Sequence, residues 1–542
     1  MDKTVFYACG CLAVVSFLSS CTYLKHTVVQ ANYSMIQNSD PSHTNLKHML
    51  DRETFFVIGK TLDEFGRYAE VSLAVAAYSD KYKTNERVDT MFSRGAGTHF
   101  GLNLPEGVYD LLVYADINGD DHFDQTEIVG EIELPLSKAL YPDLIVRQID
   151  IPLTAKKQPA RFEVISLPTD FEAAQSLFYP SGTIRSLSDP LFDENMSSLG
   201  MYDPASFLEH APTMFYALEE DEVHKIPVVF VHGIDGSARS FEPIISRLNR
   251  DRYRPWFFYY PSGGDLDQLA DFFYNIFLAG EVIPLEDMPL IVVAHSLGGI
   301  VVREAINKYK GREEENRLEL FVTIASPLGG HSAAASGEKH GLIVLPAWRD
   351  LNPDNRFIQQ LYRKPLPAFV NHQLFYAYKN SDTLKLGENS DGVVMLSSQL
   401  HPEAQKQASE TFGFDRGHVD ILTDEKMISR LLGQMGAVDS IFSDESMAAL
   451  VNGGFDVLLS DNYSPTTKHL IRYAGKYLVQ LIHGRIESIL PQQEHFVQAA
   501  RGKVPATTNF ENEFIMFMRE YPNLVDGALN NCVENSKNMT NC

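Results

Sequence analysis

A serine between small residues is the first feature of this sequence that could do chemistry. Ser296 lies in "AHSLGG", directly after the apolar run "LIVV" and before a pattern that predicts a helix. Ala294, Gly298 and Gly299 are small enough for a strand and a helix to approach closely. The same small residues would also be found in a tight turn in which the serine has no chemical role. A sharp strand-to-helix turn presents a hydroxyl at the carboxyl edge of a sheet, where open α/β folds place their sites. Ser296 is therefore the candidate nucleophile.

A serine hydroxyl needs help to react. It is a weak nucleophile at neutral pH, so it requires a base, a group that orients the base, and donors for the developing negative charge. The stretch "VHGIDGS" follows an apolar strand, where a backbone N–H can supply one donor. We expect the N–H groups of Ile234 and Leu297 to form this oxyanion hole. His232, in the same stretch, is interpreted as a residue that braces the loop rather than as the base.

The elements that must position these groups alternate in type. Strands that are apolar throughout, separated by amphipathic helices, indicate a parallel sheet covered on both faces. The expected strands are 225–233, 253–261, 288–295 and 318–327, and the expected helices are 240–250, 265–280 and 298–309. The predicted fold class is therefore α/β, with a doubly wound, mostly parallel sheet.

Five motifs together resemble one superfamily. "HGIDGSARSF", "YPSG", "AHSLGG", "IASPLGGH" and "NSDGVV" are similar to those of the α/β-hydrolases, within the esterase and triacylglycerol-lipase branch. The resemblance covers roughly residues 224–425 and departs from the commonest pattern in having Ala294 where Gly is usual. It implies a serine hydrolase that cleaves carboxylic esters, or an acyltransferase or thioesterase with the same site. It implies no cofactor for catalysis.

The resemblance also implies an acid and a base in the order serine, acid, histidine. Asp391 in "ENSDGVVML" follows a predicted strand, where the family keeps its acid, and Asp382 is its competitor. His418 in "RGHVDIL" precedes an apolar run that would anchor its loop, and His401 is the alternative base. In such a site the histidine takes the serine proton while the carboxylate holds the imidazole in the correct tautomer.

A long insertion separates two expected strands of the sheet. Residues 328–370 exceed what a short connection needs, and in this fold such an insertion commonly caps the site. His331 either lines the pocket or hydrogen-bonds within its own loop. The apolar side chains of the insertion either face an acyl chain or pack on the core; these are Leu342, Ile343, Val344, Leu345 and Trp348.

The catalytic domain, expected at residues 223–430, has a neighbour on each side. Alternating runs within 52–155 predict a small antiparallel β-sandwich, and 156–222 a connector. Residues 431–542 are expected to form a helical extension. The sandwich contains "DINGDDHFDQTE", in which oxygen ligands have EF-hand spacing, so the loop either binds structural calcium or is merely acidic. These residues are Asp116, Asn118, Asp120, Asp124 and Glu127.

The N-terminus predicts export. Its apolar run ends in "LSSC", which resembles the lipobox of bacterial lipoproteins; this implies a signal peptide at 1–20, acylation of Cys21 and a tether at 21–51, and the alternative is an ordinary secretory signal with an incidental cysteine. Thr22 after the cysteine favours the outer membrane. Cys532 and Cys542 would then form a disulfide in an oxidising compartment, or remain two thiols in a frayed tail.

The charge of the chain limits its partners. With 46 basic and 71 acidic residues the formal net charge is −25, which repels phosphate backbones and argues against nucleic acid. The expected partners are an ester or lipid substrate and the membrane that holds the acyl chains. The alternative outside enzymology is a surface binding protein whose hydrolase domain is inert.

Overall fold

The computed structural model describes most of the chain. The described residues are 54–64, 66–69, 71–79, 87–142, 144–154, 164–167, 176–211, 213–222, 224–280, 282, 288–312, 317–340, 344–379, 389–460 and 462–529.

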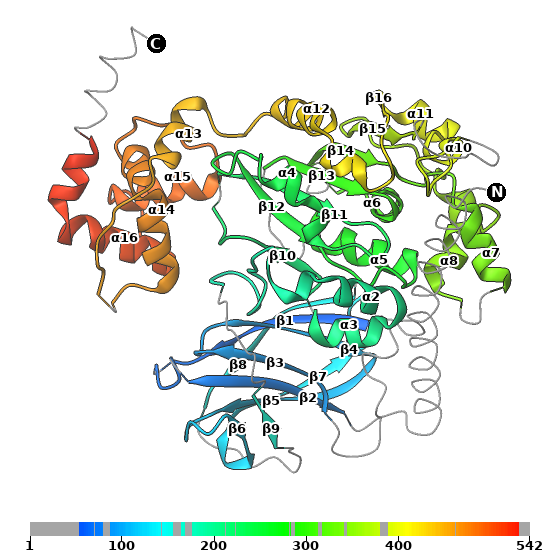
Figure 1. Ribbon diagram of the computed structural model, residues 1–542. Helices are drawn as coiled ribbons and strands as arrows, with labels where there is room; N and C mark the ends of the chain where they lie inside the picture. Colours follow the sequence, from blue (N-terminus) through cyan, green and yellow to red (C-terminus); the bar gives the residue numbers. More distant parts are fainter. Residues whose placement is uncertain are drawn as a thin grey trace, which may run out of the picture.

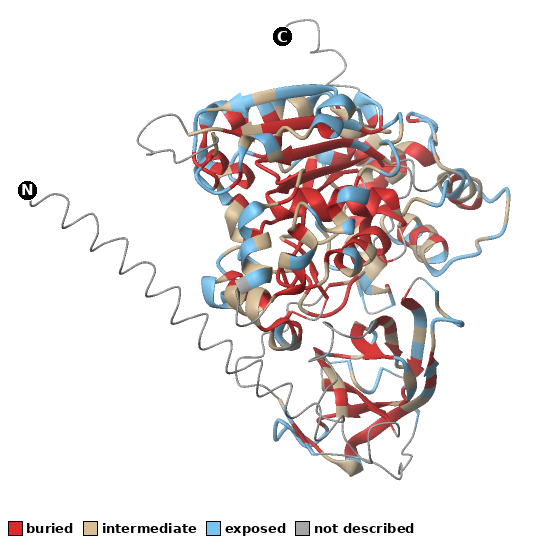
Figure 2. Cartoon of the chain, turned by 90° about the vertical axis from the view of Figure 1, so that its right-hand side faces the viewer, coloured by how far each residue is buried: buried red, intermediate tan, exposed pale blue. Residues whose placement is uncertain are grey.

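A seven-stranded sheet forms the centre of the molecule (Figure 1). Its order is β10 (Phe215–Ala217), β12 (Tyr253–Phe258), β11 (Ile226–Val231), β13 (Leu290–His295), β14 (Leu318–Ile324), β15 (Asn371–Ala377) and β16 (Glu410–Phe414). Only the edge pair β10–β12 is antiparallel, and the other five pairs are parallel. Every residue of β11, β12 and β13 is buried, as expected for parallel strands covered on both faces. Figure 2 shows the burial of these strands.

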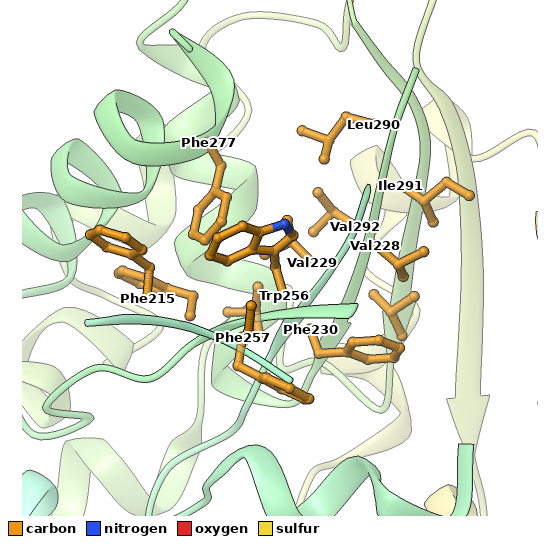
Figure 3. Close-up of a cluster of buried hydrophobic side chains, with 14 of the residues drawn as sticks. Phe215, Val228, Val229, Phe230, Trp256, Phe257, Phe277, Leu290, Ile291 and Val292 are labelled. Atoms are coloured by element: carbon orange, nitrogen blue, oxygen red, sulfur yellow. The ribbon is translucent and has the colours of Figure 1, made fainter. Parts of the chain in front are cut away.

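The core beside this sheet is rich in aromatic side chains. The ring of Trp256 in β12 lies near those of Phe215 in β10 and Phe277, with ring centroids 6.2 and 6.5 Å away (Figure 3). Phe277 belongs to a π-helical turn, Tyr274–Leu278, which continues α5 (Leu266–Phe273). The helix α6 (Leu297–Asn307) packs against α5 and contacts β11, β13 and β14. These contacts hold the first turn of α6 against the middle of the sheet.

The insertion between β14 and β15 contains three short helices, α7 (Ser332–His340), α8 (Pro346–Leu351) and α9 (Arg356–Gln360). Leu345 is buried, and Trp348 packs against the hydrophobic core. For Leu345 and Trp348 the structure therefore favours packing on the core over contact with an acyl chain. Leu342 and Ile343 lie outside the described residues.

A carboxylate of the insertion joins α8 to α5. Asp350 accepts a hydrogen bond of 3.0 Å from the N–H of Leu266. Burial raises the pKa of Asp350 from its ordinary 3.8 to about 6, and the carboxylates of Asp265 and Asp267 act in the same direction. The folded state thus binds this proton more tightly than the unfolded chain. The resulting stabilisation is present below the unfolded pKa and is lost as the pH rises through about 6.

Replacing Asp350 by Asn removes this ionisation and keeps an oxygen that can accept the Leu266 N–H. We expect Asp350→Asn to match the unaltered protein near pH ~4 and to melt about 2–4 °C higher near pH ~7.5. Calorimetry at the two pH values measures the difference, with the exposed Asp354→Asn as the control. A lower melting temperature of Asp350→Asn at the higher pH would contradict the argument.

Two small sheets precede the large one and share a buried core. One has the order β4 (His99–Pro105), β1 (Thr54–Leu62), β8 (Ile145–Pro152), and the other β3 (Arg87–Arg94), β2 (Ser72–Ser79), β5 (Gly107–Ala115), β7 (Ile128–Leu136). The expectation of a purely antiparallel arrangement is wrong at one pair, because β8 runs parallel to β1. The chain passes from β7 in one sheet to β8 in the other, and the period-two pattern carries no information on strand direction.

The expected connector contributes to both neighbouring domains. Its strand β9 (Ile165–Ser166) pairs with β6 (His122–Phe123) in the N-terminal domain, whereas β10 is the edge strand of the large sheet. Between them lie a 3₁₀ turn (Pro190–Phe192), α2 (Glu194–Tyr202) and α3 (Pro204–His210). Phe56 of β1 meets Phe215 of β10 edge to face at 6.0 Å. The sheet that contains β1 therefore packs near the β10 edge, as Figure 1 shows.

The C-terminal region is helical. After α12 (Glu425–Gly436) come α13 (Asp444–Val451), α14 (Pro465–Ile482), α15 (Pro491–Ala500) and α16 (Asn509–Glu520). Their buried side chains, such as Ile471 and Phe514, continue the core of the large sheet. His469 of α14 also hydrogen-bonds the carbonyl oxygen of Asp221 at 3.2 Å.

Candidate active site

Ser296 occupies a strained turn between β13 and α6. Its backbone has φ 52° and ψ −123°, a conformation that side-chain-bearing residues rarely adopt and that clusters at functional sites. Small neighbours make the turn possible. A methyl group at Gly298 would lie 2.5 Å from the carbonyl oxygen of Val231, and one at Gly299 would lie 2.1 Å from Ser326 Oγ. The two glycines therefore allow α6 to start against the sheet.

The structure brings Ser296, His418 and Asp391 together. Ser296 Oγ lies 2.9 Å from His418 Nε2, and His418 Nδ1 lies 2.7 Å from Asp391 Oδ2. Asp391 follows β15, and His418 lies between β16 and the 3₁₀ turn Asp420–Thr423. All three side chains are at most 9 % exposed. The carboxyl ends of three parallel strands thus place a hydroxyl, an imidazole and a carboxylate in line, at distances suited to proton transfer.

The carboxylate of Asp391 is held by four donors. Oδ1 accepts the N–H groups of Val393 and Val394 at 2.9 and 2.7 Å. Oδ2 accepts His418 and the side-chain amide of Gln399 at 3.1 Å. Gln399 ends α10 (Leu396–Gln399), is buried, and also bonds both backbone groups of Ala377 at the end of β15. Sequence reasoning missed Gln399, because no motif marks a glutamine that acts through contacts across the fold.

Three further histidines surround the site and are held neutral. Burial lowers the pKa of His295 to about 3 and that of His232 to about 4, and burial also lowers the pKa of His331. His295 Nε2–H donates to the carbonyl oxygen of His418 at 2.9 Å, which positions the loop of the proposed base. His331 Nε2–H donates to the carbonyl oxygen of Val393 at 2.9 Å. Of these four imidazoles, only His418 combines a carboxylate partner with contact to Ser296.

His232 braces the turn that follows it, which contains Gly233 and Ile234. Its Nδ1 lies 2.7 Å from the carbonyl oxygen of Gly233, and its ring stacks on Tyr260 with centroids 4.3 Å apart. A methyl group at Gly233 would lie 2.7 Å from Ser296 Cβ, so this turn lies directly against the serine. The N–H groups of Ile234 and Leu297 make no hydrogen bond within the described part of the chain. Leu297 is the first residue of α6, where N–H groups lack an intrahelical partner.

The competing base candidate His401 makes other contacts. The ring of His401 stacks on Tyr362 at 4.8 Å, and no hydrogen bond joins it to Ser296 or Asp391 among the described residues. Asp382, Cys21, Cys532 and Cys542 lie outside the described residues. Acylation, disulfide formation and export therefore stay predictions.

The acidic loop of the sandwich uses its carboxylates internally. Asp116 accepts the N–H groups of Gly119, Asp120 and Asp121, and Glu127 accepts those of Ile117 and Asp124. Asn118 and Asp120 hydrogen-bond each other. Within the described residues, no group of three or more His, Cys, Asp or Glu side chains converges as metal ligands would. Calcium binding stays a prediction.

The described helices include none that is long and apolar enough to cross a bilayer.

The fold and the site resemble those of α/β-hydrolases of the esterase-like kind. The serine lies on a strained turn after the central strand, with the N–H of the next residue and a glycine-containing turn beside it, as in the nucleophile elbow of those enzymes.

Comparisons with known proteins point the same way. A family model described as "Putative serine esterase (DUF676)" matches residues 283–353, which contain Ser296. No curated protein matches the chain.

Several solved structures are similar to part of the chain at low identity. The mature lipase BlEst2 of Bacillus licheniformis is 18 % identical over 41 % of this chain and 98 % of that one, with a TM-score of 0.32. Aspergillus fumigatus lipase B is 13 % identical over 43 % of this chain and 58 % of its own, with a TM-score of 0.33. The phospholipase PlaB of Legionella pneumophila is 18 % identical over 32 % and 45 %, with a TM-score of 0.28. These values are too low to transfer an activity.

Proposed function

We propose that the protein is a serine hydrolase that cleaves carboxylic esters through Ser296, His418 and Asp391. The observation that carries the proposal is the pair of hydrogen bonds from Ser296 to His418 and from His418 to Asp391, 2.9 and 2.7 Å long. The match of the serine-esterase family model to the segment around Ser296 supports the same class.

The geometry supports a two-step reaction. His418 Nε2 takes the proton of Ser296 Oγ as the oxygen attacks the ester carbonyl carbon, and the N–H groups of Ile234 and Leu297 stabilise the oxyanion. The C–O bond to the alcohol then breaks, and His418 gives its proton to the leaving oxygen. Water, activated by the same imidazole, releases the acid from the acyl-enzyme. Throughout, Asp391 accepts the Nδ1–H of His418, which keeps Nε2 available as the base.

A fluorophosphonate probe tests the proposal, because it forms a covalent bond only with an activated serine. We expect the full-length protein to be labelled at Ser296, which peptide mass spectrometry identifies. Ser296→Ala should abolish labelling and ester turnover. Ser332→Ala, an exposed serine of the insertion, is the control and should be labelled normally. Labelling of Ser296→Ala at the normal rate would contradict the assignment.

A further inference from the structure

Three exposed apolar side chains lie on the loops that carry the acid and the base. Val393, Met395 and Val419 are 54 %, 39 % and 63 % exposed. Isolated exposed apolar residues are ordinary on a protein surface. Here Val393 and Met395 follow Asp391 by two and four residues, and Val419 follows His418 directly, on a chain whose net charge is −25. An apolar group of that kind beside a reactive site marks a place where an apolar partner is taken out of water.

Hydrogen bonds join the two loops, and we call the surface formed by Val393, Met395 and Val419 the rim. The N–H of His418 donates to the carbonyl oxygen of Asp391 at 3.1 Å, in addition to the contact between their side chains. The N–H of Val393 donates to Asp391, and the carbonyl oxygen of Val393 accepts His331 from the insertion. The side chains of Val393 and Val419 are therefore carried by backbone that the acid–base pair itself holds in place.

The chemistry of the base decides which half of the substrate faces this rim. In the proposed reaction His418 Nε2 must protonate the leaving oxygen, so that oxygen has to come within hydrogen-bond distance of the imidazole. The alcohol half of the ester then extends past His418 and the residue after it. The proposed oxyanion donor Ile234 lies in a different loop, in the turn at Gly233 that packs against Ser296.

We propose that Val393, Met395 and Val419 bind the hydrocarbon part of the leaving alcohol, so that the enzyme prefers esters of apolar alcohols. This rests on the proposed function and adds the substrate class to it. The rim selects through the acylation step only, since the alcohol has departed before water attacks the acyl-enzyme. The preference therefore resides in kcat/KM, which reports events up to release of the alcohol.

Two ester series separate the halves of the substrate. In the first, methyl and hexyl butyrate share the acid and differ in the alcohol; in the second, methyl butyrate and methyl octanoate share the alcohol and differ in the acid. For the double substitution Val393→Thr and Val419→Thr, we expect the hexyl-to-methyl ratio of kcat/KM to fall about tenfold, because each threonine adds a hydroxyl to the apolar contact. The octanoate-to-butyrate ratio should stay unchanged. Val451→Thr is the matched control, with 51 % exposure on α13 and no place in the site.

Three other outcomes would each overturn the inference. An unchanged hexyl-to-methyl ratio, in a double variant that still reacts with the fluorophosphonate, shows that the rim does not bind the alcohol. A fall confined to the octanoate-to-butyrate ratio assigns these side chains to the acid half instead. An unaltered protein with no preference for the hexyl ester also overturns it. If the unaltered protein is neither labelled nor active on any ester, the proposed function itself fails.

Discussion

Asp391→Asn is expected to lower kcat for ester hydrolysis by about ten-thousandfold. Both carboxylate oxygens of Asp391 accept hydrogen bonds, Oδ1 from two backbone N–H groups and Oδ2 from His418 and Gln399. An amide offers only one oxygen. If that oxygen stays with the backbone donors, the NH₂ group faces His418 Nδ1, which must then become an acceptor. The proton moves to Nε2, and the imidazole no longer accepts the proton of Ser296.

Steady-state kinetics of a short-chain ester measure this loss, and circular dichroism with a melting curve establishes that the variant is folded. Asp420→Asn is the control, since Asp420 is exposed and lies only two residues after His418. A loss of less than about tenfold in Asp391→Asn would mean that this carboxylate does not set the tautomer of the base.

Gly233→Ala is the second substitution for which we expect a large effect, a fall in kcat/KM of about a hundredfold. The added methyl group would lie 2.7 Å from Ser296 Cβ, 3.3 Å from Ser296 Oγ and 3.3 Å from His295 Nδ1. The serine is held between β13 and α6, so the turn must move instead. That movement carries the N–H of Ile234 away from the place where the oxyanion forms. Misplacement of a positioning group by about 1 Å is enough for a loss of this size.

The rates of ester turnover and of fluorophosphonate labelling should fall together in Gly233→Ala, because both reactions place a negatively charged oxygen, bonded to carbon in the ester and to phosphorus in the probe, at the same N–H donors. Gly433→Ala is the matched control: Gly433 is in α12, and a methyl group there meets nothing within 4 Å. An active Gly233→Ala variant would show that this turn contributes no donor.

Much of the fold could be predicted from local pattern. Continuous apolar runs indicate β11, β12, β13 and β14 at nearly their observed bounds, because strands buried on both faces tolerate few polar residues. The predicted helix at 240–250 is less accurate, since the structure has only a 3₁₀ turn and the single turn Glu242–Ile245 there. The period-two pattern could not predict that β8 runs parallel to β1, because this pattern is the same for either strand direction.

The sequence by itself determined which groups could react. Ser296 stands out because only small residues permit its turn, and the resemblance to the α/β-hydrolases favours Asp391 and His418 over Asp382 and His401. Only the tertiary structure decided which polar groups assist them. Gln399, His295 and His331 act through hydrogen bonds to residues that folding brings beside them, and burial lowers the pKa of His232. Such contacts and such desolvation arise from packing in three dimensions, and they leave no spacing in the chain from which they could be predicted.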